Sequence, residues 1–138
     1  MPVRIPTEYR ELLDGPYVVT LATVLPDGQP HLSAMWCLLD GDDVLFSTIK
    51  QRQKYLDLSR CRQATVLAFR PDNPYRYIEV RGEVVEITEQ GGIELIDRLA
   101  KLYSGVDRYY GGVRSREALN YETRVVIRLR PHKVVTRG

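Results

Sequence analysis

Apolar and polar positions in the early part of the chain follow the period of β-strands. Residues 17–25 are dense in β-branched side chains and apolar on both faces, which is typical of a strand covered on two sides. Residues 31–39 and 44–48 predict two further strands. The turns that join the three, Pro26-Asp27-Gly28 and Asp40-Gly41-Asp42, are short. Strands joined in this way form an antiparallel meander.

The rest of the chain contains further predicted strands at residues 63–69, 75–88 and 122–135. In the long strand 75–88, Val84 continues the face of Ile78, whereas Val85 falls on the opposite face. Such a change of phase beside Gly82 is what a β-bulge or a barrel corner produces. About six strands linked mostly by hairpins must close or pair their edges, so we expect a small split β-barrel.

Helical patterns separate these strands. A short helix is predicted at residues 7–14 and a second at 50–60. An amphipathic helix follows, in which one face is formed by Ile93, Ile96, Leu99, Ala100 and Tyr103. Residues 104–121 are rich in glycine, aromatic and polar side chains, which favours a loop with a helical turn. The chain is therefore predicted to be mainly β, a single domain over residues 1–138 with about two to three peripheral helices.

The composition is that of an ordinary soluble protein, with 43% hydrophobic and 28% charged residues and a net charge of +2. So small a charge does not indicate a nucleic-acid partner. No apolar run reaches the ~20 residues that a membrane span requires, and the first residues lack the apolar segment of a secretory signal. A cytoplasmic protein is therefore expected. The spacing of Cys37, Cys61, His31 and His132 matches no zinc pattern, so no metal site is predicted.

The segment around residues 47–54 carries the strongest indication of chemistry. Ser47 and Thr48 end a predicted strand, and the start of the following helix carries Lys50, Arg52 and Lys54 without any acidic residue. A helix N-terminus bears partial positive charge, so cations there are unfavourable unless an anion binds. Hydroxyls, free backbone N–H groups and cations together favour a phosphate site. A solvated basic surface would explain the same residues without a ligand.

Two other segments would complete a ligand site. Ser33, Ala34 and Trp36 place small residues beside the only tryptophan, so that a flat ring could approach the backbone next to an aromatic side chain. Tyr75 and Tyr77 share one face of the long strand with charged residues, a composition suited to a ligand groove. A core or dimer-interface position would also account for Trp36, and a dimer interface would account for the tyrosines.

No catalytic residue is predicted. The sequence contains no Ser/His/Asp order and no isolated pair of carboxylates, so a hydrolase with its own nucleophile or acid–base pair has little support. A phosphate site and a slot for a flat ring, without a protein nucleophile, instead indicate a cofactor that performs the chemistry.

Four stretches of the sequence, taken in order, match a known family pattern. They are PDGQPHLSAMW, LFSTIKQRQKYLDL, DNPYRYIEVRGEVVEI and a helix ending in RLAKLY, and the match around them covers about residues 9–130. This order resembles the pyridoxamine-phosphate-oxidase-like split β-barrel superfamily, whose fold is of the FMN-binding kind. The basic strand–helix junction and the NPYRY…RG strand are most similar to its deazaflavin branch, whose members use coenzyme F420.

The resemblance implies a homodimer with two cofactor sites at the subunit interface. The flat ring would lie against residues 33–36, and Tyr75 and Tyr77 would approach from the partner subunit. The positions that would hold the cofactor's phosphate are Ser47, Thr48, Lys50, Arg52 and Lys54. The implied chemistry is hydride transfer between reduced F420 and a small conjugated organic substrate, with reduction of an activated double bond preferred.

Three alternatives remain open from the sequence. The same fold could bind FMN instead of F420, although the number of cations favours F420, whose tail carries further carboxylates. The protein could instead store, carry or sense the cofactor without turnover. A nucleic-acid-binding barrel is less favoured, because its aromatic and basic residues should follow one strand face, whereas here the cations concentrate at a helix start. Pyridoxamine phosphate oxidation itself is disfavoured, although Arg128, Arg130 and His132 are present near the end of the chain.

Overall fold

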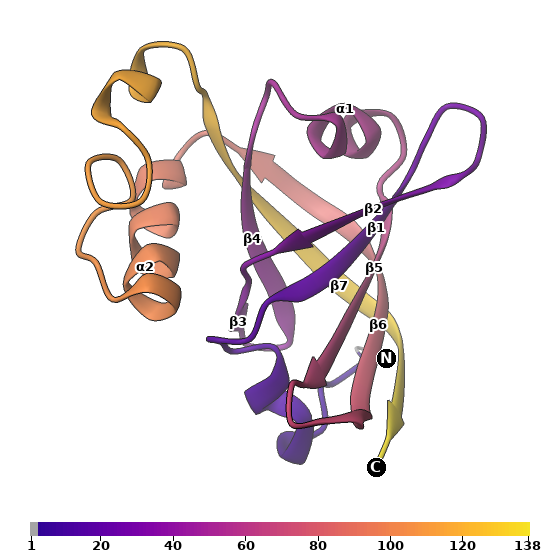
Figure 1. The fold of residues 1–138 in the computed structure, drawn as a ribbon. Coiled ribbons are helices and arrows are strands. Elements are labelled where there is room, and N and C mark those ends of the chain that lie inside the picture. Colours follow the sequence, from indigo (N-terminus) through magenta and orange to yellow (C-terminus); the bar gives the residue numbers. More distant parts are fainter. Residues whose placement is uncertain (1–2) are drawn as a thin grey trace.

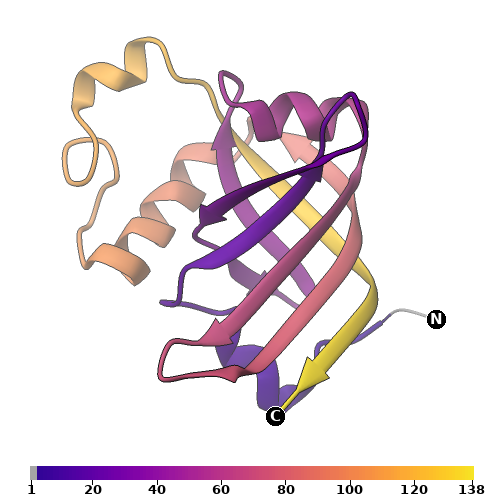
Figure 2. The ribbon, with the colours of Figure 1, turned by 45° about the vertical axis from the view of Figure 1, so that its right-hand side comes forward.

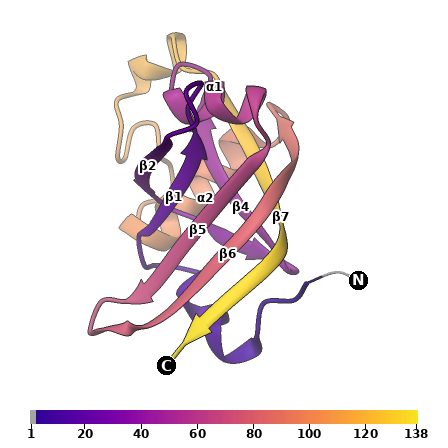
Figure 3. The ribbon, with the colours of Figure 1, turned by 90° about the vertical axis from the view of Figure 1, so that its right-hand side faces the viewer.

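The computed structural model describes residues 3–138 and consists mainly of one curled antiparallel sheet (Figure 1). Its seven strands have the order β2-β1-β5-β6-β7-β4-β3. Their bounds are Val19–Val24 for β1, Pro30–Met35 for β2, Leu38–Asp40 for β3, Asp43–Ile49 for β4, Gln63–Arg70 for β5, Asn73–Thr88 for β6 and Arg124–Arg137 for β7. The strands wrap diagonally around a shared interior, and the sheet does not close on itself (Figures 2 and 3). The predicted split barrel with peripheral helices is confirmed.

The gap in the barrel lies between β2 and β3, which the sequence predicted as one strand. This prediction was wrong because the chain leaves the sheet at Trp36 and Cys37. The hydroxyl of Tyr103, from the helix outside the barrel, accepts a hydrogen bond from the Cys37 backbone N–H at 3.1 Å and lies 2.8 Å from the Cys37 carbonyl oxygen. A side chain thus satisfies the backbone groups that a continuous ladder would have paired.

The predicted irregularity in the long strand is confirmed. Pairing between β6 and β7 shifts register between Arg81 and Gly82 and again between Val84 and Glu86. Gly82 lies so close to β7 that a Cβ atom there would collide with the backbone carbonyl of Arg130. Glycine at this position therefore lets two long strands bend together around the core.

Helices cover the ends and one side of the sheet (Figure 1). They are the 3₁₀ helices η1, Thr7–Leu12, and η2, Arg116–Asn120, and the α-helices α1, Gln53–Arg60, and α2, Gly92–Ser104. Helix α1 lies over one end of the barrel and η1 near the other, while α2 and residues 105–121 stand beside β4. In the part of the chain that the structure describes, no helix has the length and apolar character to cross a membrane.

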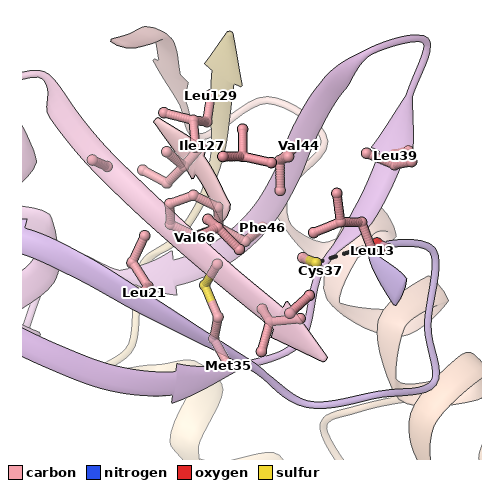
Figure 4. Packing of buried hydrophobic residues seen from close by; sticks show 14 of the residues in the cluster. Leu13, Leu21, Met35, Cys37, Leu39, Val44, Phe46, Val66, Ile127 and Leu129 are labelled. Carbon is pink, nitrogen blue, oxygen red and sulfur yellow. Dashed lines mark hydrogen bonds between the residues drawn. The ribbon is translucent and has the colours of Figure 1, made fainter. Parts of the chain in front are cut away.

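The main hydrophobic core fills the barrel interior (Figure 4). Phe46, Leu21 and Ile127 are fully buried there, together with Cys37, whose thiol donates a hydrogen bond to the Leu13 carbonyl at 3.3 Å. Burial raises the pKa of Cys37 to about 12, so this thiol stays protonated. A second apolar cluster joins α2 to the outer side of the strands β3, β4 and β7, through Leu38, Leu45, Leu95, Ile96, Leu99 and Val126. The candidate site opens beside this second cluster.

Candidate functional site

A cleft of about 200 Å³ lies where the ends of β2 and β4 meet the start of α1, with α2 and residues 105–121 as its far wall. One side is polar and carries three cations, and the other is apolar and aromatic. The lining residues are Ala34, Met35, Trp36, Ser47, Thr48, Arg52, Lys54, Ile96, Leu99, Tyr109, Val113 and Arg124. No carboxylate is among them.

The start of α1 supplies the first two cations. The helix begins at Gln53, three residues later than the sequence predicted, so that Arg52 occupies the N-cap and Lys54 lies in the first turn. No side chain caps this N-terminus, and its first turn contains no acidic residue. The backbone N–H groups at a helix start need acceptors and favour negative charge, so an anion would complete this end of α1.

Lys54 is the most unusual of the cations because it is buried. The residue is only 7% exposed, and among residues 3–138 it forms no ion pair with a carboxylate. Burial, and then the nearby charges of Arg52 and Arg124, lower the pKa of Lys54 from its usual 10.5 to about 8. A buried ammonium without a counter-ion is unfavourable, and a bound anion would remove that cost.

The two hydroxyls at the end of β4 face the same cleft. Thr48 is 1% exposed, and its Oγ1 has no hydrogen-bond partner within the described part of the chain. Ser47 Oγ accepts a hydrogen bond from Arg124 Nη1 at 3.3 Å. Buried hydroxyls are almost always hydrogen-bonded, and Thr48 lines the cleft, so its unpartnered hydroxyl is available to a molecule bound there.

Arg124, the first residue of β7, completes the polar side, and sequence reasoning missed it. Its side chain is 6% exposed, and its guanidinium lies 4.7 Å from the ring centre of Tyr109. Along the predicted strand 122–135, Arg124 shares a face with Arg128 and Arg130, so its side chain is expected to face outward. It is buried here because α2 and residues 105–121 fold back over the start of β7, which strand periodicity does not reveal.

The opposite wall is aromatic. Trp36 stacks on Tyr103 with ring centres 5.2 Å apart, and Tyr109 meets the edge of Trp36 at 6.1 Å. Ile96 and Leu99 of α2 add aliphatic surface. Tyr109 and Val113 come from the segment that the sequence predicted only as a loop, so their place in the cleft had no signal beyond that segment's aromatic content. A flat ring that carries an anionic group fits a site with these two walls.

The comparison with protein families identifies the fold. A sequence model described as pyridoxamine 5'-phosphate oxidase matches residues 5–138. The chain belongs to the pyridoxamine 5'-phosphate oxidase family. No curated protein matches it.

Solved structures of similar proteins agree with membership in the pyridoxamine 5'-phosphate oxidase family. An F420 reductase is 33% identical, with a TM-score of 0.79 over 95% of this chain and 98% of the other. A conserved hypothetical protein of Mycobacterium tuberculosis is 24% identical, with a TM-score of 0.73 over 99% and 86%. HupZ of Group A Streptococcus is 16% identical, with a TM-score of 0.68 over 96% and 93%. The last two show the fold alone.

Six of the residues predicted as a cofactor site line the cleft of this family member: Ala34, Trp36, Ser47, Thr48, Arg52 and Lys54. Lys50 does not. Because α1 starts at Gln53, Lys50 lies in the turn before the helix, where its ammonium is 2.6 Å from a Glu89 carboxylate oxygen. This hydrogen bond raises the pKa of Lys50, and its charge is already balanced within the chain.

The other predicted residues also lie outside the cleft of the single chain. Ser33 is in β2 but does not line the cleft, and its Oγ is buried without a hydrogen-bond partner among residues 3–138. Tyr75 is 78% exposed near the start of β6, and Tyr77 lines a different hollow on the outer face of the sheet. Their role at a cofactor stays a prediction that requires a second subunit. Within the described residues, no group of acidic, histidine and cysteine side chains is placed to hold a metal ion.

Proposed function

We propose that this protein is a cytoplasmic, homodimeric F420-dependent oxidoreductase that transfers hydride between reduced deazaflavin and a small conjugated organic substrate. Membership in the pyridoxamine 5'-phosphate oxidase family and the similarity to an F420 reductase fit a flavin-type oxidoreductase. One observation supports this cleft as the cofactor site. Arg52, Lys54 and Thr48 present two cations and an unpartnered hydroxyl where no carboxylate balances them.

Different residues of the cleft would contact different parts of the cofactor. Arg52, Lys54 and the start of α1 would hold a phosphate, with Thr48 donating its hydroxyl hydrogen. Ala34 and Met35 would form the floor beneath a flat ring, and Trp36 would close its edge. When bound, F420 supplies a deazaflavin ring that exchanges a hydride with the substrate. The protein orients the two molecules and keeps water from the apolar wall.

The outer face of the sheet supports a second copy of this chain as the partner. Ala34, Thr20 and Leu67 are neighbours across β2, β1 and β5, so the cleft wall is continuous with this face. Exposed apolar side chains lie on it, including Leu32 at 62% and Phe69 at 38%. A partner that covers this face would bring a Tyr77 and a Tyr75 toward the region of the cleft, which is the arrangement that the resemblance implies.

A side-by-side titration tests the proposal. The unliganded protein is titrated with F420 and with FMN, and the emission of Trp36 and of the ligand is followed. We expect F420 to bind more tightly, and we expect Arg52→Gln to weaken its binding by about tenfold or more, because a charge-assisted contact is lost. Arg62→Gln is the matched control, since Arg62 is an exposed arginine just after α1 that does not line the cleft.

Each other result corrects a different part of the proposal. Preference for FMN would replace the cofactor and keep the site. Tight F420 binding without turnover of any activated alkene would favour a carrier or sensor. Equal effects of the Arg52 and Arg62 variants would remove the cleft as the phosphate site. Sedimentation at several concentrations tests the homodimer, and a monomer at every concentration would contradict it.

A further inference from the structure

A buried chain of polar side chains leads from the surface of segment 105–121 to the cleft. Arg114 contacts Glu122 through Nε at 2.8 Å and Nη2 at 2.7 Å. Tyr110 Oη lies 2.7 Å from the other oxygen of Glu122, and Arg124 Nε lies 2.9 Å from the same Tyr110 hydroxyl. Glu122 and Arg124 side chains are only 3% and 6% exposed. Four polar groups are therefore packed together beside an apolar cluster.

The direction of each hydrogen bond in this chain is fixed by chemistry. A guanidinium has only donors, so Arg124 donates to the Tyr110 oxygen. The single hydroxyl hydrogen of Tyr110 must then go to the Glu122 carboxylate. Burial alone would raise the pKa of Glu122, but the hydrogen bonds from Arg114 and Tyr110 outweigh it and lower that pKa, so the carboxylate is ionised.

The tyrosine separates two opposite charges that would otherwise pair. Glu122 is 2.7 Å from Arg114 but 4.0 Å from Arg124, at the limit of an ion pair. One carboxylate balances one cation, and the closer partner is Arg114. The charge of Arg124 is therefore not balanced by a close carboxylate, and its Nη1 reaches Ser47 Oγ at the polar side of the cleft. The same charge acts on Lys54 and contributes to its lowered pKa.

We propose that Arg124 is a further anion-contacting residue of the cleft, and that Arg114, Glu122 and Tyr110 are positioning residues that hold its guanidinium there with its charge available. The inference rests on the proposed binding of an anionic cofactor in this cleft. It assigns a role to Arg114, which does not line the cleft. Without Arg114, the Glu122 carboxylate would pair with Arg124 instead. Anion binding in the cleft would then weaken, although Arg114 itself lies outside the cleft.

The decisive comparison uses two arginines of one segment. Arg114→Gln and Arg116→Gln remove the same charge, but Arg116 is exposed and makes no contact with Glu122 in the described structure. Binding of F420 and of inorganic phosphate is measured by calorimetry at fixed ionic strength. We expect Arg114→Gln to weaken both about three- to tenfold, and Arg116→Gln to change them less than about twofold.

A double-mutant cycle separates positioning from a general effect on the fold. Arg124→Gln should weaken both ligands about tenfold or more, and Arg114→Gln should then add almost nothing in the Arg124→Gln background. Tyr110→Phe should also weaken binding, whereas Tyr9→Phe, at a buried tyrosine of η1 near the other end of the barrel, should not. Thermal unfolding of every variant checks that the fold is intact.

The outcomes distinguish this inference from the proposed function. F420 binding that is unaffected by Arg124→Gln would overturn the inference and leave the function standing. Phosphate binding that depends on Arg124, without any binding of F420 or FMN, would support the inference and overturn the function. Additive losses from Arg114→Gln and Arg124→Gln would show that Arg114 acts independently and would also overturn it. Absence of binding by every probe would remove both.

Discussion

Several charged side chains lie at the turn between β3 and β4, and several others lie in the cleft at the start of α1. The two regions differ in whether the chain itself supplies counter-ions for these charges. At the turn, the Asp43 carboxylate lies 3.0 Å from the guanidinium of Arg128 and 3.1 Å from that of Arg130. The Asp40 carboxylate lies 2.8 Å from the guanidinium of Arg128. In the cleft, Arg52 and Lys54 have no carboxylate partner among residues 3–138.

The charges at the turn and the charges in the cleft have opposite effects on the stability of the fold. Burial alone would raise the pKa of Asp43, but the bonds from Arg130 and Arg128 outweigh it and lower that pKa, so the charges at the turn support the fold. The buried Lys54 has the opposite effect, because its charge is desolvated without compensation. The charges at the turn therefore stabilise the fold, whereas the uncompensated cations of the cleft fit the proposed anionic ligand. Arg128 and Arg130, although basic, are paired with these carboxylates and do not line the cleft.

The largest expected effect comes from removing the unbalanced charge. Lys54→Met should weaken F420 binding by about 10- to 100-fold, because a hydrogen bond to a charged group is lost. The same change should raise the unfolding temperature of the unliganded protein by a few degrees, about 1 kcal/mol, because a desolvated cation is replaced by a thioether. Ligand titration and thermal unfolding measure the two quantities. Lys101→Met, at an exposed lysine of α2, is the control and should change neither.

The pH dependence of binding sharpens the comparison. A bound anion raises the pKa of Lys54, so binding takes up a proton once the free lysine, with a pKa of about 8, has lost it. F420 affinity should be level below pH 7 and should fall by up to about tenfold per unit above pH 8. Lys54→Arg should remove this fall, because arginine keeps its charge. A level profile in the unmodified protein would contradict the assignment.

Stability without ligand should change in the opposite direction over the same range. The folded pKa of Lys54, about 8, lies below its usual 10.5, so the unfolded chain binds more protons between these values. The contribution of this residue to stability is therefore largest above pH 10.5 and is lost as the pH falls toward 8. Urea unfolding of the unmodified protein and Lys54→Met at several pH values isolates this contribution.

A substitution at the turn should lower stability and leave ligand binding almost unchanged, which is the reverse of the effect expected for Lys54→Met. Asp43→Asn should lower the free energy of unfolding by about 1–2 kcal/mol, because Arg128 and Arg130 lose their shared acceptor charge. F420 affinity should change less than about twofold, since the turn and the cleft are separate. Urea unfolding and ligand titration of one preparation compare the two. A large loss of affinity with unchanged stability would erase the distinction between the regions.

The smallest effect is expected at Lys50. Its charge is balanced by Glu89, and both side chains are exposed, at 38% and 60%. Lys50→Ala should therefore leave F420 affinity within about twofold and stability almost unchanged, because an exposed ion pair contributes little. A loss comparable to that of Lys54→Met would mean that Lys50 turns into the cleft when ligand binds, as the sequence predicts.

Local patterns predicted much of the fold. The β1–β2 and β3–β4 hairpins, the irregularity beside Gly82 and the amphipathic helix α2 all follow from side-chain periodicity and backbone freedom within a few residues. The single meander predicted from the two hairpins was wrong, because they lie at opposite edges of the sheet. The break between β2 and β3 does not follow from a local pattern, because it depends on the Tyr103 hydroxyl, which is 66 residues away from Cys37 in sequence. The sequence predicts the start of α1 three residues too early, because Lys50 and Gln51 have good helix propensity but lie in a turn.

The candidate site was predictable where its residues form a contiguous motif. Thr48, Arg52 and Lys54 lie close together in sequence and were found together. Arg124 was missed because its burial depends on a segment that precedes it and folds back over it. No local pattern distinguishes such an arginine from one on a solvated strand face, as Arg130 shows at 59% side-chain exposure.

The place of β7 in the sheet has a consequence for how this chain acquires its structure. β7 follows every other strand in sequence, yet it lies between β6 and β4 and joins the two parts of the sheet. Until it is synthesised, β2-β1-β5-β6 and β4-β3 are separate ribbons with unpaired edges, and the barrel interior has no closed wall. The two parts can therefore join only after β7 has been synthesised, and such non-local pairing is expected to make folding slow compared with that of a helical domain of equal size.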